Sequence, residues 1–349
     1  MEMNPIYRNI LMVRTDRIGD VVLTTPAVHA LKKAFPQSRI SLLVAPLTQD
    51  LVCGNPNIDE VLLDDRKNEH KGLFGFIRLV QLIKSKKFDL AINFHTKKRT
   101  NLLCFLARIP HRLGYKNEKL GFLLNMKVFD DRPQGNKHEA RYCLDVLKAL
   151  DIYEEECKVF VPLQDEAEKW AEEFFHENRL DRAQLIIAVH PGASCPTKRW
   201  PLERFSELIN ILNDKYACDI VLIGGKDNLK NAEEIIENLD VPVIDLTGQT
   251  SVGQLASLFK RCHLLVSNDS GPVHIADGVG IPVVSIFTRN QPGINPERWK
   301  PLGENSQCVA PAPFKSISFK KGEVEDPEYL NKIEVKDVLE AVDAVFKLC

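Results

Sequence analysis

The sequence predicts an α/β protein with two doubly wound, Rossmann-like domains that face each other across a cleft. Short apolar runs alternate with amphipathic stretches in both halves of the chain, which is the pattern of βαβ units around a parallel sheet. The 349 residues also exceed what one hydrophobic core usually serves. Each half contains a polar turn that follows a buried strand and leads into a helix, and two such turns suggest a shared ligand cleft.

The first domain is expected to span residues 1–162. Its predicted strands are 10–13, 40–44, 61–63 and 90–94, and its predicted helices are 21–35, 74–84 and 101–107. The boundary follows Pro162, because proline interrupts the preceding extended run. Asp165 with Glu168 resembles an N-cap and its capping-box partner, so a new helix should begin there.

The second domain is expected to span residues 163–331. Its predicted strands are 185–189, 220–223, 243–246, 264–267 and 283–287, and Pro201 should stand in the first turn of a helix over 202–216. Ser251 and Gln254 form a capping box ahead of a helix over 255–262. Residues 311–331 should be irregular, and residues 335–348 an amphipathic helix within a final segment, 332–349.

Charge and cysteine content exclude several classes of protein. Lys and Arg number 46 against 48 Asp and Glu, so a general nucleic-acid binder is not indicated. The stretch 84–116 is nevertheless basic, with nine Lys or Arg residues against Asp89 alone. The nine cysteines are scattered without a C-x-x-C pair, which predicts reduced thiols and no metal site. No signal peptide or membrane-spanning run is evident, so we expect a cytoplasmic protein.

The segment Asn268-Asp269-Ser270-Gly271-Pro272-Val273-His274 is the strongest candidate for a binding site. It connects a buried strand to a helix, and a helix start presents unpaired N–H groups and the positive end of the peptide dipoles. Such a turn suits the phosphates of a nucleotide. His274 would bond a phosphate or cap its own helix.

Three further loops of the second half should meet this turn at the carboxyl ends of the strands. The loop 190–201 carries Ser194 and Lys198, whose charge could neutralise a diphosphate or simply be solvated. Gly224-Gly225 precedes Asp227 and Asn228, either of which could hold a ribose hydroxyl, although paired glycines are as often a plain turn. Thr247 and Gly248 could close over a base or ribose.

In the first half, Asp20 follows Gly19 at a predicted helix start. A carboxylate there can stabilise the helix dipole. It can also act as a general base that removes the proton of an attacking hydroxyl, if that hydroxyl comes within hydrogen-bond reach. Both readings remain open on the residues alone.

Together these segments resemble the heptosyltransferase family, inverting glycosyltransferases that add heptose from ADP-heptose to the lipopolysaccharide core. The likeness rests on 14–26, on His190-Pro191-Gly192 with Lys198-Arg199-Trp200-Pro201, on 268–274, and on His138-Glu139-Ala140-Arg141-Tyr142. It implies the GT-B architecture, with the last helix returning to the first domain. It also implies that Asp20 is the base, that Lys198, Asp269, Ser270, Gly271 and His274 bind the donor phosphates, and that Asp227 or Asn228 holds the ribose. The loops themselves add Ser194, Thr247 and Gly248 to the expected donor site.

The family's acceptors are anionic and lipid-linked, so the basic stretch could bind acceptor phosphates or an anionic membrane surface. The candidates are Lys97, Lys98, Arg99, Arg108 and Arg112, for which a solvated helix face is the alternative. We expect an enzyme that works at the cytoplasmic face of the inner membrane, with the ADP-sugar as substrate and no cofactor. Because no D-x-D signature stands in a suitable loop, we expect no metal requirement.

Two other functions fit the same architecture. A nucleotide-sugar epimerase would alter the donor without an acceptor, and a non-catalytic module would bind the donor without turnover. A dehydrogenase is disfavoured, because the G-x-G-x-x-G fingerprint of dinucleotide binding is absent.

Overall fold

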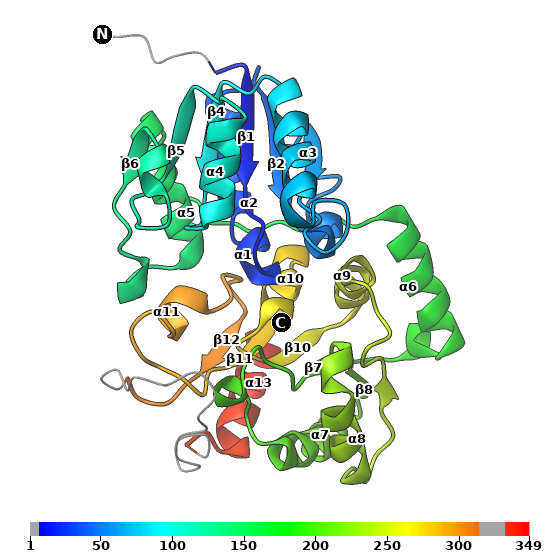
Figure 1. The fold of residues 1–349 in the computed structure, drawn as a ribbon. Coiled ribbons are helices and arrows are strands. Elements are labelled where there is room, and N and C mark those ends of the chain that lie inside the picture. Colours follow the sequence, from blue (N-terminus) through cyan, green and yellow to red (C-terminus); the bar gives the residue numbers. More distant parts are fainter. Residues whose placement is uncertain (1–6, 314–331, 349) are drawn as a thin grey trace. The chain divides into compact units, whose positions relative to one another are not determined.

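The chain divides into two units, each built around its own parallel sheet (Figure 1). The computed structural model describes residues 7–313 and 332–348. The first unit runs to Pro133 and resumes over Glu139–Pro162, and the second holds Gln134–His138 and the chain from Leu163 onward.

The sheet of the first unit has six parallel strands in the order β3-β2-β1-β4-β5-β6. Their bounds are β1 (Asn9–Val13), β2 (Arg39–Val44), β3 (Glu60–Leu63), β4 (Leu90–Asn93), β5 (His111–Tyr115) and β6 (Met126–Val128). The chain leaves β1 toward β2 on one side and comes back to β4 on the other. The loop after β1 therefore leads toward one side of the sheet and the loop after β4 toward the other. Ligands of open parallel sheets bind where the strand order reverses in this way.

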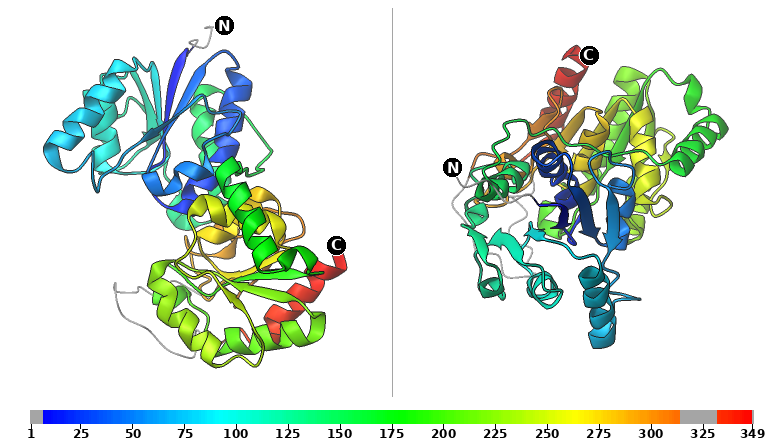
Figure 2. Two further views of the ribbon diagram at one scale, coloured as in Figure 1. Left: turned by 90° about the vertical axis from the view of Figure 1, so that its right-hand side faces the viewer. Right: turned by 90° about the horizontal axis from the view of Figure 1, so that it is seen from above.

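Helices cover both faces of this sheet (Figure 2). Helices α3 (Gly72–Ser85) and α4 (Lys98–Leu106) contact each other, and α2 (Thr25–Ala34) contacts α5 (Glu139–Leu147). Under α3 and α4, the core joins strand residues such as Leu11 and Ala91 to Leu79 and Leu103. The remaining helical turns are α1 (Ile18–Val22), η1 (Pro46–Leu51), η2 (Gly121–Leu123), η3 (Arg132–Gln134) and η4 (Lys148–Leu150).

The second unit repeats the plan with the strand order β12-β11-β10-β7-β8-β9, again parallel throughout. Its strands are β7 (Ile186–His190), β8 (Asp219–Leu222), β9 (Ile244–Asp245), β10 (Leu264–Asn268), β11 (Val283–Ile286) and β12 (Gln307–Val309). The order reverses between β7 and β10. The loops after these two strands are therefore the expected ligand position in this unit.

Two groups of helices pack on this second sheet. Helices α6 (Asp165–Glu177), α9 (Val252–Arg261) and α10 (Gly271–Val279) form one group, and α7 (Leu202–Tyr216), α8 (Leu229–Glu237) and α13 (Val335–Leu348) form the other. The short elements are η5 (Leu180–Arg182), η6 (Pro196–Lys198), η7 (Lys226–Asn228) and α11 (Pro296–Trp299). The largest buried side chain of the core is Trp200, whose ring lies 5.0 Å from that of Phe205, centroid to centroid.

The last helix, α13, lies in the second unit rather than returning to the first domain as the family resemblance implied. Its buried residues Val335, Val338, Val342 and Val345 recur at helical spacing and pack in the same core as Leu208 of α7. One apolar face is thereby buried against α7, so this packing accounts for the amphipathic pattern that the sequence shows.

Several predicted elements differ in detail. The helix expected over 21–35 is split into α1 and α2 at Leu23 and Thr24, because Pro26 cannot donate its amide to a continuous helix. The N-cap of α6 is Gln164 and not Asp165, which stands inside the first turn. The capping box of Ser251 and Gln254 is confirmed. Most of the irregular stretch expected over 311–331 lies outside the described residues.

Among the described residues, no helix has both the length and the apolar character needed to cross a membrane.

Candidate active site

In the first unit, the loop after β1 puts a buried arginine among three carboxylates. Arg14 is 1% exposed, and its guanidinium is ion-paired with Asp20, with Asp16 at 3.0 Å and with Glu139 at 2.9 Å. It also donates to the carbonyl of Phe94 at 2.8 Å. Burial by itself lowers the pKa of Arg14, but the carboxylates of Asp16 and Asp20 outweigh it and raise that pKa well above its usual value.

Asp20 stands in the first turn of α1, and its side chain is 14% exposed. The residue at the N-cap is Arg17, so Asp20 does not cap the helix through its side chain. The Thr24 hydroxyl donates to the Asp20 carbonyl at 2.8 Å, which ties the end of α1 to its start. Asp20 is therefore a fixed carboxylate that is still partly open to solvent, as a general base requires.

Basic groups surround Thr15 next to this carboxylate cluster. His95 Nε2 lies 3.1 Å from the Thr15 hydroxyl, to which Arg66 also donates at 2.7 Å, and Lys97 donates to the Thr15 carbonyl at 3.4 Å. Burial, together with the charge of Arg14, holds the pKa of His95 well below its usual value, so this ring is neutral. Burial also lowers the pKa of Lys97.

The candidate acceptor residues do not all lie together. Lys97 is near Asp20, and Lys98 is exposed at the start of α4. Arg99 binds both carboxylate oxygens of Asp64, at 2.8 and 2.9 Å, and the His70 carbonyl at 3.0 Å. These three positions follow β4 and so lie toward the carboxyl edge of the sheet.

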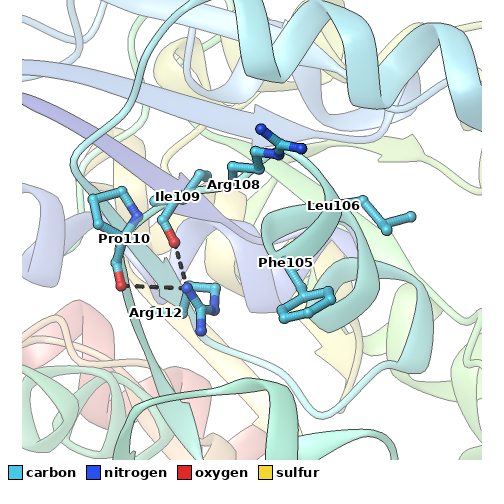
Figure 3. A pocket seen from close by; sticks show the side chains of 6 residues that line it. All are labelled: Phe105, Leu106, Arg108, Ile109, Pro110 and Arg112. Carbon is cyan, nitrogen blue, oxygen red and sulfur yellow. Dashed lines mark hydrogen bonds between the residues drawn. The ribbon is translucent and has the colours of Figure 1, made fainter.

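Arg112 and Arg108 lie elsewhere. Arg112 is the second residue of β5 and so stands at the amino end of that strand, the opposite edge of the sheet from Asp20. Its guanidinium donates to the carbonyl of Leu123 at 2.7 Å. It also donates to the carbonyls of Ile109 at 2.5 Å and Pro110 at 3.2 Å (Figure 3). Arg108 is exposed, and it lines a pocket together with Arg112 and Phe105 (Figure 3). The structure does not bring Arg112 or Arg108 together with Asp20.

In the second unit, the predicted anion turn is organised around a buried histidine. Ser270 is the N-cap of α10, and its hydroxyl lies 3.1 Å from His190 Nδ1 and 3.1 Å from the Ser267 hydroxyl. Burial lowers the pKa of His190 to about 4, so the ring is neutral and orients the two hydroxyls as a hydrogen-bonding partner. With Pro272 inside the first turn and no side-chain cap bond, the helix start retains N–H groups for a ligand.

Lys198 reaches this turn from the loop after β7. Its ammonium group is ion-paired with Asp269, and the two side chains are only 16% and 8% exposed. Asn268 joins the same two loops, because its side chain accepts from the Trp200 amide at 3.1 Å and donates to the Pro191 carbonyl at 2.7 Å. The lysine is thus held at the start of α10.

Asp227 and Asn228 have different surroundings in the loop after β8. Asp227 is exposed, whereas Asn228 is 5% exposed and donates to an Asp227 carboxylate oxygen at 3.1 Å. The Asn228 side-chain oxygen packs so closely on Gly192 that a Cβ on this glycine would come within 2.8 Å of it. Asn228 therefore positions Asp227, which is the residue open to a ligand.

The remaining predicted donor residues lie on the same edge of the second sheet. Gly248 has a φ of +72°, which favours glycine, and its amide donates to the Gly224 carbonyl at 2.8 Å. Thr247 is 2% exposed, and within the described part of the chain its hydroxyl has no hydrogen-bond partner. Ser194 is exposed, and His274 is buried one turn into α10.

The ion pair of Arg14 with Glu139 was not predicted from the sequence. Glu139 begins α5 and is completely buried, and a buried carboxylate needs a cationic partner. The burial of Glu139 is seen only in the structure, and 125 residues separate it from Arg14, so the sequence alone could not identify this pair.

The chain resembles known proteins along nearly its whole length. It is 27% identical to the lipooligosaccharide heptosyltransferase 2 of Haemophilus ducreyi, over 93% of this chain and 95% of that one. A crystal structure of a family 9 glycosyltransferase from Veillonella parvula has a TM-score of 0.86 and 26% identity, with 99% of both chains covered. The ADP-heptose lipopolysaccharide heptosyltransferase II of Escherichia coli shares the fold, with a TM-score of 0.78 and 22% identity over 97% of this chain and 99% of that chain.

These similarities support the predicted GT-B fold and a glycosyltransferase, and they do not support the epimerase alternative. The sequence model of glycosyltransferase family 9 (heptosyltransferase) matches residues 76–328. Because this match covers more than half of the chain, the protein belongs to glycosyltransferase family 9 (heptosyltransferase).

Proposed function

We propose that this glycosyltransferase transfers heptose, with inversion, from ADP-heptose to the lipopolysaccharide core or a related lipid-linked glycan. The main observation behind the proposal is the anion turn of the second unit, where Ser270 and Lys198 lie at the start of α10. The chain also belongs to a family of heptosyltransferases. The names of the Haemophilus ducreyi and Escherichia coli relatives supply the sugar and the acceptor class.

The donor diphosphate would lie on the turn Asp269–Gly271. Backbone N–H groups at the start of α10 and the Lys198 ammonium group carry the positive charge that a leaving diphosphate needs. Asp227 would accept a hydrogen bond from a ribose hydroxyl, and the buried hydroxyl of Thr247 would bond the base or ribose. Because these groups can neutralise the leaving group, we propose that the reaction requires no metal ion.

Asp20 would receive the proton of the acceptor hydroxyl. As the hydroxyl oxygen forms a bond to the anomeric carbon from the face opposite the diphosphate, the bond between this carbon and the diphosphate oxygen breaks. ADP then leaves with the electron pair, and the configuration at carbon 1 inverts. Arg14 would keep the carboxylate in one orientation for each turnover.

The acceptor is anchored in lipid, so the enzyme would work at the cytoplasmic face of the inner membrane. Lys97 stands near Asp20 and is the best placed of the basic residues to meet an acceptor phosphate.

Two measurements test the proposal. In a thermal-shift screen of ADP, UDP, GDP and CDP, ADP should raise the melting temperature most, because a ligand of the folded state stabilises it. ADP-heptose with a heptose-deficient core acceptor should then release ADP and extend the glycan, also in the presence of EDTA. Binding of ADP-heptose without product, for any core acceptor, would favour the non-catalytic alternative. Loss of activity in EDTA that Mg²⁺ restores would contradict metal independence.

A further inference from the structure

Helix α3 of the first unit has apolar side chains on its outer half as well as on its inner half. The inner residues Phe76, Leu79 and Ile83 are buried in the core. On the outer half, Leu73 is 70% exposed, Phe74 is 82% exposed, and Ile77 and Leu82 are also exposed. A surface helix normally presents polar residues on that half, so this exposed apolar surface requires an explanation.

The charge on α3 and along the chain after it is mostly positive, although the exposed Glu69 stands just before the helix and its carbonyl accepts from Arg78. The helix itself contains Arg78 and Lys84 but no acid, and both cations are exposed on its outer half. Between Lys71 and Arg112 the sequence has ten Lys or Arg residues and only one acid, Asp89. The neighbouring helix α4 covers the same face of the sheet and exposes Phe105 and Leu106, and Arg108 follows it (Figure 3).

We propose that this outer half of α3, which we call the α3 surface (Leu73, Phe74, Ile77, Arg78, Leu82 and Lys84), docks on an anionic lipid bilayer. Aromatic and aliphatic side chains can enter the interface between headgroups and acyl chains, while Lys and Arg contact lipid phosphates. A protein partner would need acidic groups arranged around an apolar centre, whereas an anionic bilayer offers both features over a continuous surface.

The position of α3 within the first unit suits this role, which rests on the proposed transfer to a lipid-linked acceptor. Asp64 follows β3 and binds both Arg66 and Arg99. Arg66 in turn donates to Thr15, next to the loop that carries Asp20. The start of α3, with its most exposed apolar residues, therefore lies at the carboxyl edge of the sheet, the edge that carries Asp20. Docking there would bring this edge toward the membrane surface.

Vesicle sedimentation with the full-length protein tests the proposal. The protein should bind vesicles of phosphatidylcholine and phosphatidylglycerol in equal parts, bind pure phosphatidylcholine more weakly, and be released by added salt. Phe74→Asp should reduce binding at least about tenfold, because it replaces an inserted ring with a charge that anionic lipids repel. Lys71 is the exposed N-cap residue of α3, beside this surface, so Lys71→Glu with Lys84→Glu should reduce binding to anionic vesicles by a similar factor.

A matched control is Tyr153→Asp. Tyr153 is 71% exposed in the same unit but precedes three acids, Glu154, Glu155 and Glu156, so its replacement should leave binding unchanged. Equal vesicle binding by Phe74→Asp and the wild-type protein would overturn the proposal. A change of oligomeric state in Phe74→Asp without a change in vesicle binding would also overturn it, since the α3 surface would then be an interface between copies of the chain.

The same variant separates this proposal from the proposed function. Phe74→Asp should transfer heptose to a deacylated, water-soluble core acceptor at the wild-type rate, and lose rate only with the acceptor embedded in anionic vesicles. If the wild-type protein binds vesicles through Phe74 but transfers heptose to neither acceptor, the proposed function fails and the docking surface stands. Full activity on the embedded acceptor by the variant would count against the docking surface alone.

Discussion

The ammonium group of Lys198 is ion-paired with the carboxylate of Asp269, one residue before the N-cap of the helix that would bind the donor diphosphate. The positive charge of the lysine is therefore already balanced without a ligand. A diphosphate must share the lysine with Asp269, and the turn relies on the N–H groups of α10 for its remaining positive character.

Removal of the lysine should weaken ADP binding strongly. Lys198→Ala removes a charge-assisted contact and also leaves Asp269 uncompensated beside the phosphates, so we expect the Kd for ADP to rise about 100-fold, or about 2.7 kcal/mol. Adding Asp269→Asn to this variant should restore part of the affinity, because the repulsion is then absent. Isothermal titration calorimetry measures both effects. Lys230→Ala, an exposed lysine of α8, is the control, and equal affinities of the single and double variants would contradict this account.

Asp227, rather than Asn228, should recognise the ribose. Asp227→Ala should raise the Kd for ADP about tenfold, the loss of about 1.4 kcal/mol expected for a hydrogen bond to a charged group. The Kd for 2′,3′-dideoxy-ADP should not change, because that ligand lacks the hydroxyls. Glu233→Ala, on the exposed side of α8, serves as the control. The assignment is wrong if Asn228→Ala abolishes the preference for ADP while Asp227→Ala retains it.

Much of the fold could be predicted from the sequence because its buried strands are short, apolar and regularly spaced. Strands β5 and β6 were missed, since His111, Arg112 and Gly114 in β5 and Lys127 in β6 interrupt any apolar pattern. They become strands because neighbouring strands already provide an edge with which to pair. Strand β12, which pairs with β11 at the edge of the second sheet, was missed in the same way.

The candidate site was less accessible to sequence reasoning than the fold. The turn around Ser270 could be read because strand, glycine and helix follow one another locally. Two ion pairs could not be read in this way, because their partners are far apart in the chain: Arg14 with Glu139, and Lys198 with Asp269. Sequence patterns also grouped Arg112 with Lys97, whereas the structure puts them at opposite ends of parallel strands.

The neutral, buried His190 should make the second unit sensitive to acid. Burial lowers the pKa of His190 to about 4, against about 6.5 in an unfolded chain. Between pH 4 and 6.5 the unfolded state binds more protons than the folded state. The contribution of neutral His190 to the free energy of unfolding is therefore complete above about pH 6.5 and is lost as the pH falls toward 4.

From pH 7 to pH 4.5, the wild-type free energy of unfolding should therefore fall about 2 kcal/mol further than that of His190→Gln. All three tryptophans, Trp170, Trp200 and Trp299, lie in the second unit, so urea titration followed by tryptophan fluorescence measures this unit selectively. His95 of the first unit is present in both proteins, so its contribution to the pH dependence of stability cancels when the two are compared. Parallel losses in the two proteins would mean that His190 is not the group responsible.

Arg14 should be required for the stability of the first unit. Arg14→Ala leaves Asp16, Asp20 and the buried Glu139 without their common cation, which we expect to cost about 3–5 kcal/mol. Hydrogen exchange of the β1 and β4 amides should accelerate by a factor of about 10²–10⁴. Arg17→Ala removes an exposed arginine of the same loop and should change exchange little. Unchanged protection in Arg14→Ala would show that the carboxylates do not depend on this ion pair.

The most direct test of the central claim compares two carboxylates that are both paired with Arg14. If Asp20 is the base, Asp20→Asn should lower kcat for heptose transfer by about 10²–10⁴ while the Kd for ADP-heptose stays nearly unchanged. Asp16→Asn, which alters the same ion-pair cluster, should retain most of the activity. Transfer by Asp20→Asn at close to the wild-type rate, or loss of activity confined to Asp16→Asn, would contradict the account.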